Sequence, residues 1–481
     1  MPKRDMRILL VTNDRLGRER AGPAIRCIEL AKVLAREHEV TIASGVPGDI
    51  ELPGIPVIFD AMRNPAVLRS AARRVDIAIT QGLVLDIFPF LRRLCRYVVV
   101  DLYDPYLFEH LAQKGRSFAI WRFLRQWRLL NDQLRLGDFF ICANERQWDY
   151  WLGCLCALGR LTPEEHERDP SFQKLLSIVP FGIGSQPPRH ERTVMKGVMP
   201  GISSNDILLL WAGGIWQWFD PLTIIKAMGL LRDRVDIKLL FMGTRHPNPD
   251  IPEMPVVAES RKVAQDLGIL GRSVFFRDGW VPFDERQNFL LEADIGVSAH
   301  TNTVETRLAF RTRVLDYVWA GLPMILTEGD YFAEMVSREN VGKAVAPGDA
   351  EGWKGAILSL AVSSAERQAM RLRLSVLRER FHWGKVAGPL ADYCRDPHHT
   401  RGLSGFRIGL SRFLTTAYGH LLRLRARKPI LPVSPRKHSR EAKFMDNRYP
   451  HTEDDDGQRS GPLKSGLKRS DATTGDRSLE K

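Results

Sequence analysis

Three charged residues stand close together within residues 305–330, a stretch that reads ETRLAFRTRVLDYVWAGLPMILTEGD. Arg311 and Arg313 lie at the start of an apolar repeat with helical spacing, and Asp316 follows one turn further on. Free backbone N–H groups, a helix dipole and two guanidinium groups suit a diphosphate, and a carboxylate one turn deeper suits the paired hydroxyls of a ribose. A solvated helix start with salt-bridged arginines would explain the same residues, so the chemistry alone leaves both interpretations open.

The elements that must position these side chains form a strand–loop–helix–strand pattern. Residues 292–299 predict a buried strand, residues 312–320 a helix and residues 324–327 the next strand. Gly321 can adopt the left-handed conformation that ends a helix, and Pro323 blocks its continuation. Such a unit belongs to a parallel sheet, in which ligands bind beyond the carboxyl ends of the strands.

A second candidate position lies near the N-terminus. Residues 7–12 predict a strand, and residues 25–36 predict a helix after a polar loop. Gly22 and Arg26 stand at the start of that helix, where they could admit a phosphate or a sugar close to the backbone. An ordinary turn with a surface arginine is the alternative, and the absence of a GxGxxG motif gives a dinucleotide site little support.

Two carboxylates and two glycines follow other predicted strands. Asp101 and Asp104 lie in the sequence DLYDP after the strand predicted at 97–102, where they could position a sugar hydroxyl or a proton. They could equally cap the next helix, because Asp before Pro is a common turn start. Gly213 and Gly214 follow the strand predicted at 207–211 and would let the backbone approach a ligand closely.

The segment LDYVWAGLPMI resembles the LEAMACGTPVI signature of GT-B glycosyltransferases, particularly those of family 4 (group 1), which are retaining enzymes. The resemblance places Asp316 where that family has its ribose-binding glutamate. The family's first glutamate lies eight residues upstream of the second, a position held here by Leu308. Its sugar-contacting role is therefore carried over to Glu305, eleven residues upstream of Asp316.

The loop after residue 211 departs from the family's GR…KG pattern, whose cations hold the donor diphosphate. Ile215 follows the second glycine and the loop contains no lysine, while Trp216 and Trp218 are present instead. The resemblance then makes Arg311 and Arg313 the expected phosphate-binding cations. The tryptophans could stack on a sugar or a base, or simply pack.

The resemblance implies a GT-B fold of two Rossmann-like domains that face each other across a cleft. We expect an acceptor domain at 1–185, a nucleotide-sugar donor domain at 186–382 and a helix at 383–400 that crosses back to the first domain. The implied activity is transfer of a sugar from a nucleotide-sugar donor to a glycan or lipid-linked acceptor hydroxyl, with retention, in cell-surface polysaccharide or glycolipid assembly. No metal or cofactor is expected in such an enzyme.

Two other functions stay open at this point. A GT-B enzyme can be a nucleotide-sugar epimerase or a phosphorylase, and a GT-B scaffold without catalytic activity could act at the membrane. The missing GR…KG pattern is what keeps the second alternative open.

The net charge of +13 over 481 residues is concentrated near the C-terminus. Residues 401–443 hold eleven basic side chains and one acidic side chain, so the charge does not indicate nucleic-acid binding by the rest of the chain. Residues 401–428 combine arginines with an apolar stripe at helical spacing, which suits an anionic membrane surface or docking on the protein itself. Residues 429–481 have the composition of a disordered tail.

Six cysteines without CxxC spacing predict reduced thiols, and we find no signal peptide or span-length apolar run. The expected protein is cytoplasmic, with a candidate peripheral contact at the inner face of the membrane.

Overall fold

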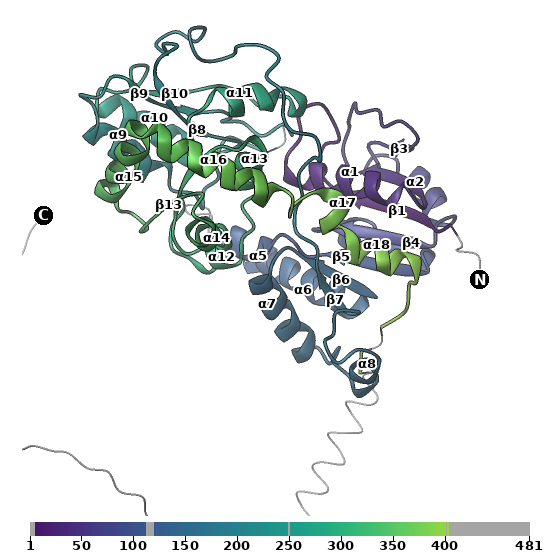
Figure 1. Ribbon diagram of the computed structural model, residues 1–481. Coiled ribbons are helices and arrows are strands. Elements are labelled where there is room, and N and C mark those ends of the chain that lie inside the picture. The colour runs from purple at the N-terminus through teal and green to yellow at the C-terminus, as the bar shows by residue number, and fades with distance from the viewer. Residues whose placement is uncertain (1–4, 112–119, 249–250, 401, 404–481) are drawn as a thin grey trace, which may run out of the picture. The chain divides into compact units, whose positions relative to one another are not determined.

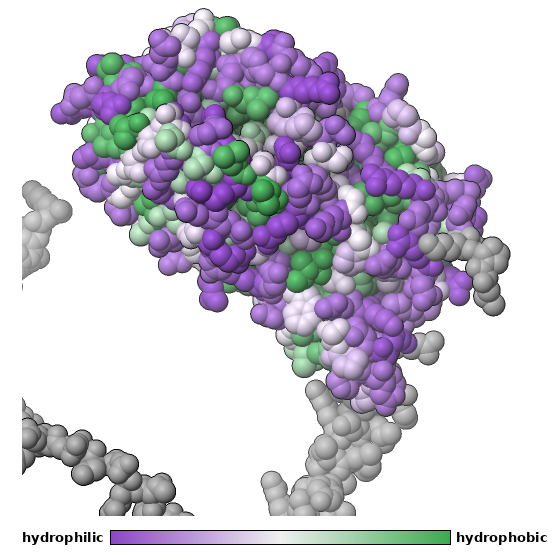
Figure 2. Space-filling view, viewed as in Figure 1, coloured by the Kyte–Doolittle hydropathy of each residue, from purple (hydrophilic) through white to green (hydrophobic). Residues whose placement is uncertain are grey.

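The computed structural model describes residues 5–111, 120–248, 251–400 and 402–403, all of which belong to one compact unit, Met1–Ser411. Two parallel sheets flanked by helices make up this unit (Figure 1). The predicted architecture of two Rossmann-like α/β domains is confirmed. On the face seen in Figure 2, hydrophilic side chains predominate and hydrophobic ones form scattered patches.

The first sheet has seven parallel strands in the order β3-β2-β1-β4-β5-β6-β7. Its strands are β1 (Arg7–Thr12), β2 (Glu39–Ser44), β3 (Val57–Ile58), β4 (Ile77–Gln81), β5 (Tyr97–Asp101), β6 (Phe139–Cys142) and β7 (Leu176–Ile178). Its helices are α1 (Gly22–Leu34), α2 (Pro65–Ala72), α3 (Val84–Ile87), α4 (Leu91–Leu94), α5 (Tyr106–Leu111), α6 (Ile120–Leu136), α7 (Glu145–Ala157) and α8 (Pro163–Arg168). The central strands are buried along their whole length, as expected for a parallel sheet with both faces covered.

The second sheet has six parallel strands in the order β10-β9-β8-β11-β12-β13. Its strands are β8 (Ile207–Trp211), β9 (Ile237–Phe241), β10 (Val274–Phe276), β11 (Ile295–Ser298), β12 (Met324–Thr327) and β13 (Gly342–Val345). The helices are α9 (Pro221–Leu230), α10 (Pro255–Asp266), the 3-10 turn η1 (Phe283–Glu285), α11 (Arg286–Glu292), α12 (Val304–Leu308), α13 (Thr312–Ala320), α14 (Tyr331–Glu339), α15 (Ala350–Val362), α16 (Ser364–Arg378), α17 (Trp383–Val386) and α18 (Gly388–Arg395).

Helix α13 is fixed to the second sheet by Tyr317. Its hydroxyl lies 2.9 and 2.8 Å from carbonyl oxygens at Leu210 of β8 and Val297 of β11, and it accepts a hydrogen bond from the backbone N–H of Ala212. Gly296 leaves room for the ring, because a Cβ at this position would come within 2.7 Å of it. The start of α13 is therefore held at the carboxyl ends of β8 and β11.

The last two helices return to the first sheet. Helix α17 packs against α1 and α18 against β7. Tyr393 of α18 stacks on Phe139 of β6, with ring centroids 4.3 Å apart and an interplanar angle of 6°. The largest cluster of buried apolar side chains runs through both sheets, so the two domains share part of their core.

Several elements differ from those that the sequence predicts. Residues 178–181 predict a short strand, but β7 covers 176–178, the residues that pair with β6. The basic residues 358–380 predict one exposed helix, but Ser363 separates α15 from α16 and caps α16 by accepting from the N–H of Glu366. Gly321 ends α13 with φ of +65°, as predicted.

The two sheets fall within the segments predicted as domains 1–185 and 186–382, whose limits stay a prediction. Apart from 402–403, the amphipathic segment at 401–428 and the tail at 429–481 lie outside the described residues. Within the described ranges, no helix is both long and apolar enough to cross a bilayer.

Candidate functional site

A cavity of about 960 Å³ lies between the carboxyl ends of the two sheets. The first domain lines it with the loop before α1, the segment after β5 and helix α6. The second domain lines it with the loops after β8, β9 and β10 and with the start of α13. Ligand sites of parallel sheets are expected at this edge, so the topology places the cavity where the sequence predicts a site.

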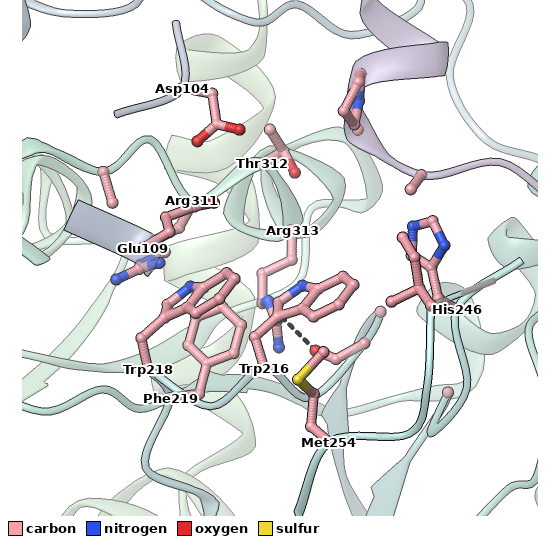
Figure 3. A pocket seen from close by; sticks show the side chains of 18 of the residues that line it. Asp104, Glu109, Trp216, Trp218, Phe219, His246, Met254, Arg311, Thr312 and Arg313 are labelled. Atoms are coloured by element: carbon pink, nitrogen blue, oxygen red, sulfur yellow. Dashed lines mark hydrogen bonds between the residues drawn. The ribbon is translucent and has the colours of Figure 1, made fainter. Parts of the chain in front are cut away.

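Arg313, in the first turn of α13, is buried in the wall of the cavity (Figure 3). Its Nη2 donates to the carbonyl of Gly214 at 2.6 Å, and its guanidinium lies over the ring of Phe219, 4.2 Å from the centroid. Among the described residues, no carboxylate pairs with Arg313 and its Nη1 has no hydrogen-bond partner. Burial lowers its pKa to about 10, which leaves the side chain charged at neutral pH.

Arg311 precedes α13 as its N-cap residue, but its charge is already matched. Glu305 of α12 accepts from both Nη atoms, at 2.9 and 2.6 Å, and both side chains are buried. Burial lowers the pKa of Arg311, but the Glu305 carboxylate outweighs this and the pKa is raised. Glu305 faces Arg311 and is absent from the cavity lining, so the structure does not bring this predicted catalytic residue to the cavity.

Asp316 lines the cavity one turn beyond Arg313. Its Oδ1 accepts from Nε of Arg286 at 3.0 Å, and the Arg286 guanidinium lies between the rings of Phe283 and Trp319, 3.5 and 4.4 Å from their centroids. The carboxylate is thus held in place by a fixed cation while remaining partly exposed to the cavity.

Glycine backbone forms the floor beside Arg313. Gly213 has φ of +83°, a conformation that favours glycine, and both Gly213 and Gly214 line the cavity. Gly22, the first residue of α1, lines the opposite wall. All three predicted glycines therefore reach the same cavity.

Arg26 and Asp101 do not reach it, contrary to the predicted ligand contacts. Both side chains are fully buried, and Arg26 donates to Asp101 at 2.6 and 3.1 Å. Arg26 also donates to the carbonyls of Val179 and Pro180, and Gln81 donates to Asp101. This ion pair joins α1 to the strands of the first sheet, so its structural role replaces the predicted one.

Aromatic side chains cover another part of the wall (Figure 3). Trp216 and Trp218 stack with centroids 5.6 Å apart and an interplanar angle of 8°. The ring of His246 lies 5.4 Å from Trp216 and 5.9 Å from Trp280. Burial lowers the pKa of His246 to about 4, and its Nδ1 accepts from the N–H of Asn248, so the neutral ring carries its proton on Nε2.

Asp104 lines the cavity as predicted, together with a carboxylate that sequence reasoning missed. Glu109 of α5 lines the cavity too. Burial raises the pKa of Asp104 to about 6, and burial together with the charges of Asp104 and Glu305 raises the pKa of Glu109 well above its ordinary value. The only signal in the sequence was the spacing of the two acids across the start of a short helix.

Comparisons with known proteins concern the family of one segment and the fold. Residues 206–362 match the sequence model of a family described as Glycosyl transferases group 1. No curated protein sequence matches the chain.

Solved structures share its fold at low sequence identity. WaaG, a glycosyltransferase involved in lipopolysaccharide biosynthesis, is 16% identical with a TM-score of 0.58, over 80% of this chain and 99% of WaaG. HepE from Anabaena in complex with UDP-glucose is 16% identical with a TM-score of 0.58, over 80% of this chain and 98% of HepE. Sucrose-phosphate synthase from Thermosynechococcus elongatus is 15% identical with a TM-score of 0.59, over 81% of this chain and 98% of the synthase.

Proposed function

We propose that this chain, which has the GT-B fold and carries a group 1 glycosyl transferase domain at residues 206–362, transfers a sugar from a nucleotide-sugar donor to an acceptor hydroxyl. The observation that carries the proposal is Arg313, a buried cation without a carboxylate partner among the described residues, at the start of a helix and at the wall of the cavity.

The donor diphosphate would bind between the first turn of α13 and the backbone of Gly213 and Gly214. Helix N-termini bind anions through their free N–H groups and dipole, and Arg313 adds a full charge. Because Glu305 neutralises Arg311, Arg313 is the stronger phosphate-binding candidate of the two. Asp316 would accept hydrogen bonds from the ribose hydroxyls, and its pairing with Arg286 would keep it in position.

The aromatic wall suits the flat or apolar faces of the donor. Trp216 and Trp280 offer ring surfaces next to His246, whose Nε2–H is a neutral hydrogen-bond donor. HepE, which shares the fold, has been solved with UDP-glucose, which supports a nucleotide-sugar donor for this chain.

Catalysis would consist of electrostatic stabilisation of the leaving nucleoside diphosphate. Negative charge develops on the diphosphate oxygen as its bond to the anomeric carbon breaks, and a buried cation with helix N–H groups stabilises that charge strongly. We infer that the acceptor attacks from the same face, so that the product retains the anomeric configuration. Support for retention comes from the family signature at residues 315–325.

We also infer that the acceptor is a glycan or a lipid-linked glycan of the cell surface. WaaG, which shares the fold, is involved in lipopolysaccharide biosynthesis, and residues 401–428 of this chain have the composition of a segment that binds an anionic membrane surface. The protein would then act in the cytoplasm, peripherally at the inner face of the membrane.

The test is a titration of the protein with UDP, GDP, ADP and CDP, followed by incubation of the best binder's nucleotide sugar with an extract of cell-surface glycans and glycolipids. We expect 1:1 binding of at least one diphosphate, and a glycosylated product whose anomeric proton has the configuration of the donor. A donor that is only isomerised or hydrolysed, even with acceptors present, would contradict transfer, and a product of inverted configuration would contradict retention.

A further inference from the structure

The start of helix α7 is a place where the first domain holds part of the second. Helix α12 follows β11 in the second domain, but it packs against α5 and α7 of the first domain (Figure 1). Ala309, Phe310 and Arg311, which come directly after α12, line the cavity. A contact that fixes the end of α12 therefore also fixes the part of the cavity wall that leads into α13.

This contact is made by Gln147, a fully buried side chain in the first turn of α7. Its Nε2 donates to the carbonyl of Tyr103 at 2.8 Å and to the carbonyl of Leu308 at 2.7 Å. Its Oε1 accepts from the N–H of Ala143 at 2.8 Å, so the amide is satisfied in one orientation only. Both amide hydrogens are then used, and a buried amide whose groups all have partners forms a rigid connection.

The two carbonyls that share this nitrogen belong to different domains. Tyr103 stands directly before Asp104 in the first-domain wall of the cavity, and Leu308 is the last residue of α12. Because both oxygens bond the same nitrogen, they can lie no more than about 6 Å apart. Gln147 thus fixes the distance between the first-domain wall and the segment that leads into α13.

Arg146, the residue before Gln147, supports this contact. Its Nη1 donates to the carbonyl of Gly329 at 2.7 Å and to that of Arg307 at 3.3 Å, and its Nη2 pairs with Glu334 of α14. Arg146 is half-buried and Glu334 is exposed, and ion pairs of this kind contribute little to stability. The buried amide of Gln147 is therefore the stronger of the two connections.

The domains also meet at the 3-10 turn η1, where the side chains are more exposed. The N–H of Phe283 donates to the carbonyl of Arg18 at 2.9 Å. Two ion pairs accompany this hydrogen bond, Arg18 with Glu285 at 3.7 Å and Arg20 with Asp284 at 3.5 Å. One partner of each pair is exposed, so solvent weakens both. This contact holds the domains less firmly than the one between α7 and α12.

We propose that Gln147 is a positioning residue for sugar transfer: it holds the wall at Tyr103 and Asp104 at the distance from α13 at which an acceptor on the first domain reaches the donor sugar. This inference rests on the proposed function, in which the second domain binds the donor diphosphate beside Arg313. Gln147 itself does not line the cavity, so it acts through the two walls that it joins. Its loss should leave donor binding intact and slow the transfer step, because a misplacement of about 1 Å can lower a rate about 10²-fold.

Gln147→Met tests this role, because methionine keeps the length of the side chain but removes both donors and the acceptor. Gln133→Met is the matched control, since Gln133 of α6 is also buried and its Nε2 donates to the carbonyl of Gly82 within the first domain. Rates are measured well below the melting temperature of each variant, with the nucleotide sugar of the diphosphate that binds best. We expect kcat for transfer to fall roughly 10²-fold in Gln147→Met, while the Kd for the diphosphate stays within about threefold of the wild type. Gln133→Met should change neither.

A distance measurement reports on the two domains without any substrate. Cys156 is exposed on α7 and Leu372 is exposed on α16, so Cys156 and Leu372→Cys can carry one spin label in each domain. Cys154→Ser removes the neighbouring half-buried thiol from all of these proteins. Pulsed electron paramagnetic resonance should give a broader distribution of label distances in Gln147→Met than in the wild type or in Gln133→Met.

An unchanged kcat in Gln147→Met, an equal fall of kcat in Gln133→Met, or an unchanged distance distribution would overturn the positioning role. If Gln147→Met does not fold, Arg146→Met takes its place and should show the same changes to a smaller degree; wild-type kcat and distances in Arg146→Met would then overturn the role. Unchanged kcat with intact diphosphate binding overturns the role of Gln147 alone. A wild type that binds no nucleoside diphosphate would instead overturn the proposed function, and this inference with it.

Discussion

Replacement of Arg313 by methionine should weaken ligand binding without lowering the stability of the folded protein. Arg313→Met keeps most of the buried volume but removes the charge at the start of α13. A hydrogen bond from a charged group to phosphate contributes about 1.5–3 kcal/mol, which corresponds to a rise in Kd of roughly 10- to 150-fold. Replacing a buried charge by an apolar side chain of similar size is often neutral or stabilising, so the melting temperature should change little.

The loss of the hydrogen bond from the Arg313 guanidinium to the Gly214 carbonyl should cost about 1–3 kcal/mol, and removal of an unpaired buried charge offsets this cost. Arg311→Met should behave differently, because it leaves the buried carboxylate of Glu305 without its partner and is expected to lower stability by about 3–5 kcal/mol.

The assay is titration calorimetry with the nucleoside diphosphate that binds the wild type, combined with thermal unfolding of each variant. Arg307→Met, at an exposed position of α12, is the control for removing an arginine from the same part of the chain. A Kd for Arg313→Met within about twofold of the wild type would refute the assignment of Arg313 to the phosphate. So would a loss of affinity that is accompanied by an equal loss in Arg307→Met.

Three further predictions concern other parts of the chain. Asp316→Asn should weaken binding of the nucleoside diphosphate but leave inorganic pyrophosphate binding nearly unchanged, as measured by calorimetry; equal losses would mean that Asp316 only holds Arg286. Asp14 is buried, its Oδ2 has no hydrogen-bond partner among the described residues, and burial raises its pKa to about 6. The stability of the folded state therefore falls as pH rises from about 4 to 6 and stays lower above pH 6. Asp14→Asn should therefore be more stable than the wild type by about 1–3 kcal/mol at pH 7.5 and by little at pH 4.5 in urea unfolding; an equal difference at both pH values would contradict this cause. The full chain should co-sediment with anionic vesicles at low salt and be released as ionic strength rises, while a chain ending at residue 403 should fold, bind nucleotide and lose vesicle binding. That end point keeps the hydrogen bond from the N–H of Leu403 to Gly159, and vesicle binding by the shortened chain would contradict the role of the tail.

The elements around α13 were predictable because their signals are local. The apolar spacing, Gly321 and Pro323 define both ends of this helix, and the short apolar runs on either side define its strands. The structure reproduces the predicted helix and the strand at 324–327 without a shift. The residue type of Asn144 likewise predicts a helix N-cap after the apolar run at 139–143, and its side chain accepts from the N–H of Gln147.

The partners of the charged residues were not predictable, because they lie far apart along the chain. Asp101 and Arg26 are separated by 75 residues, and each alone is compatible with a ligand contact. Only the packing of α1 on the sheet shows that they neutralise each other. Glu109 was missed for the same reason, since its role depends on which face of α5 lines the cavity between the domains.

The break between α15 and α16 had a local signal that the prediction of one helix overlooked. Ser363 and Glu366 have the S-x-x-E spacing of a capping box, which marks the start of a helix. The side chain of Ser363 accepts from the N–H of Glu366 and caps α16.

The central claim is that the cavity beside α13 holds the diphosphate of a nucleotide sugar. Calorimetric titration of the full chain with UDP, GDP, ADP and CDP, repeated with Arg313→Met, tests it most directly. We predict that at least one diphosphate binds the wild type at a 1:1 ratio and binds Arg313→Met roughly 10- to 150-fold more weakly. No binding by any of the four, or equal binding by wild type and variant, would contradict the account.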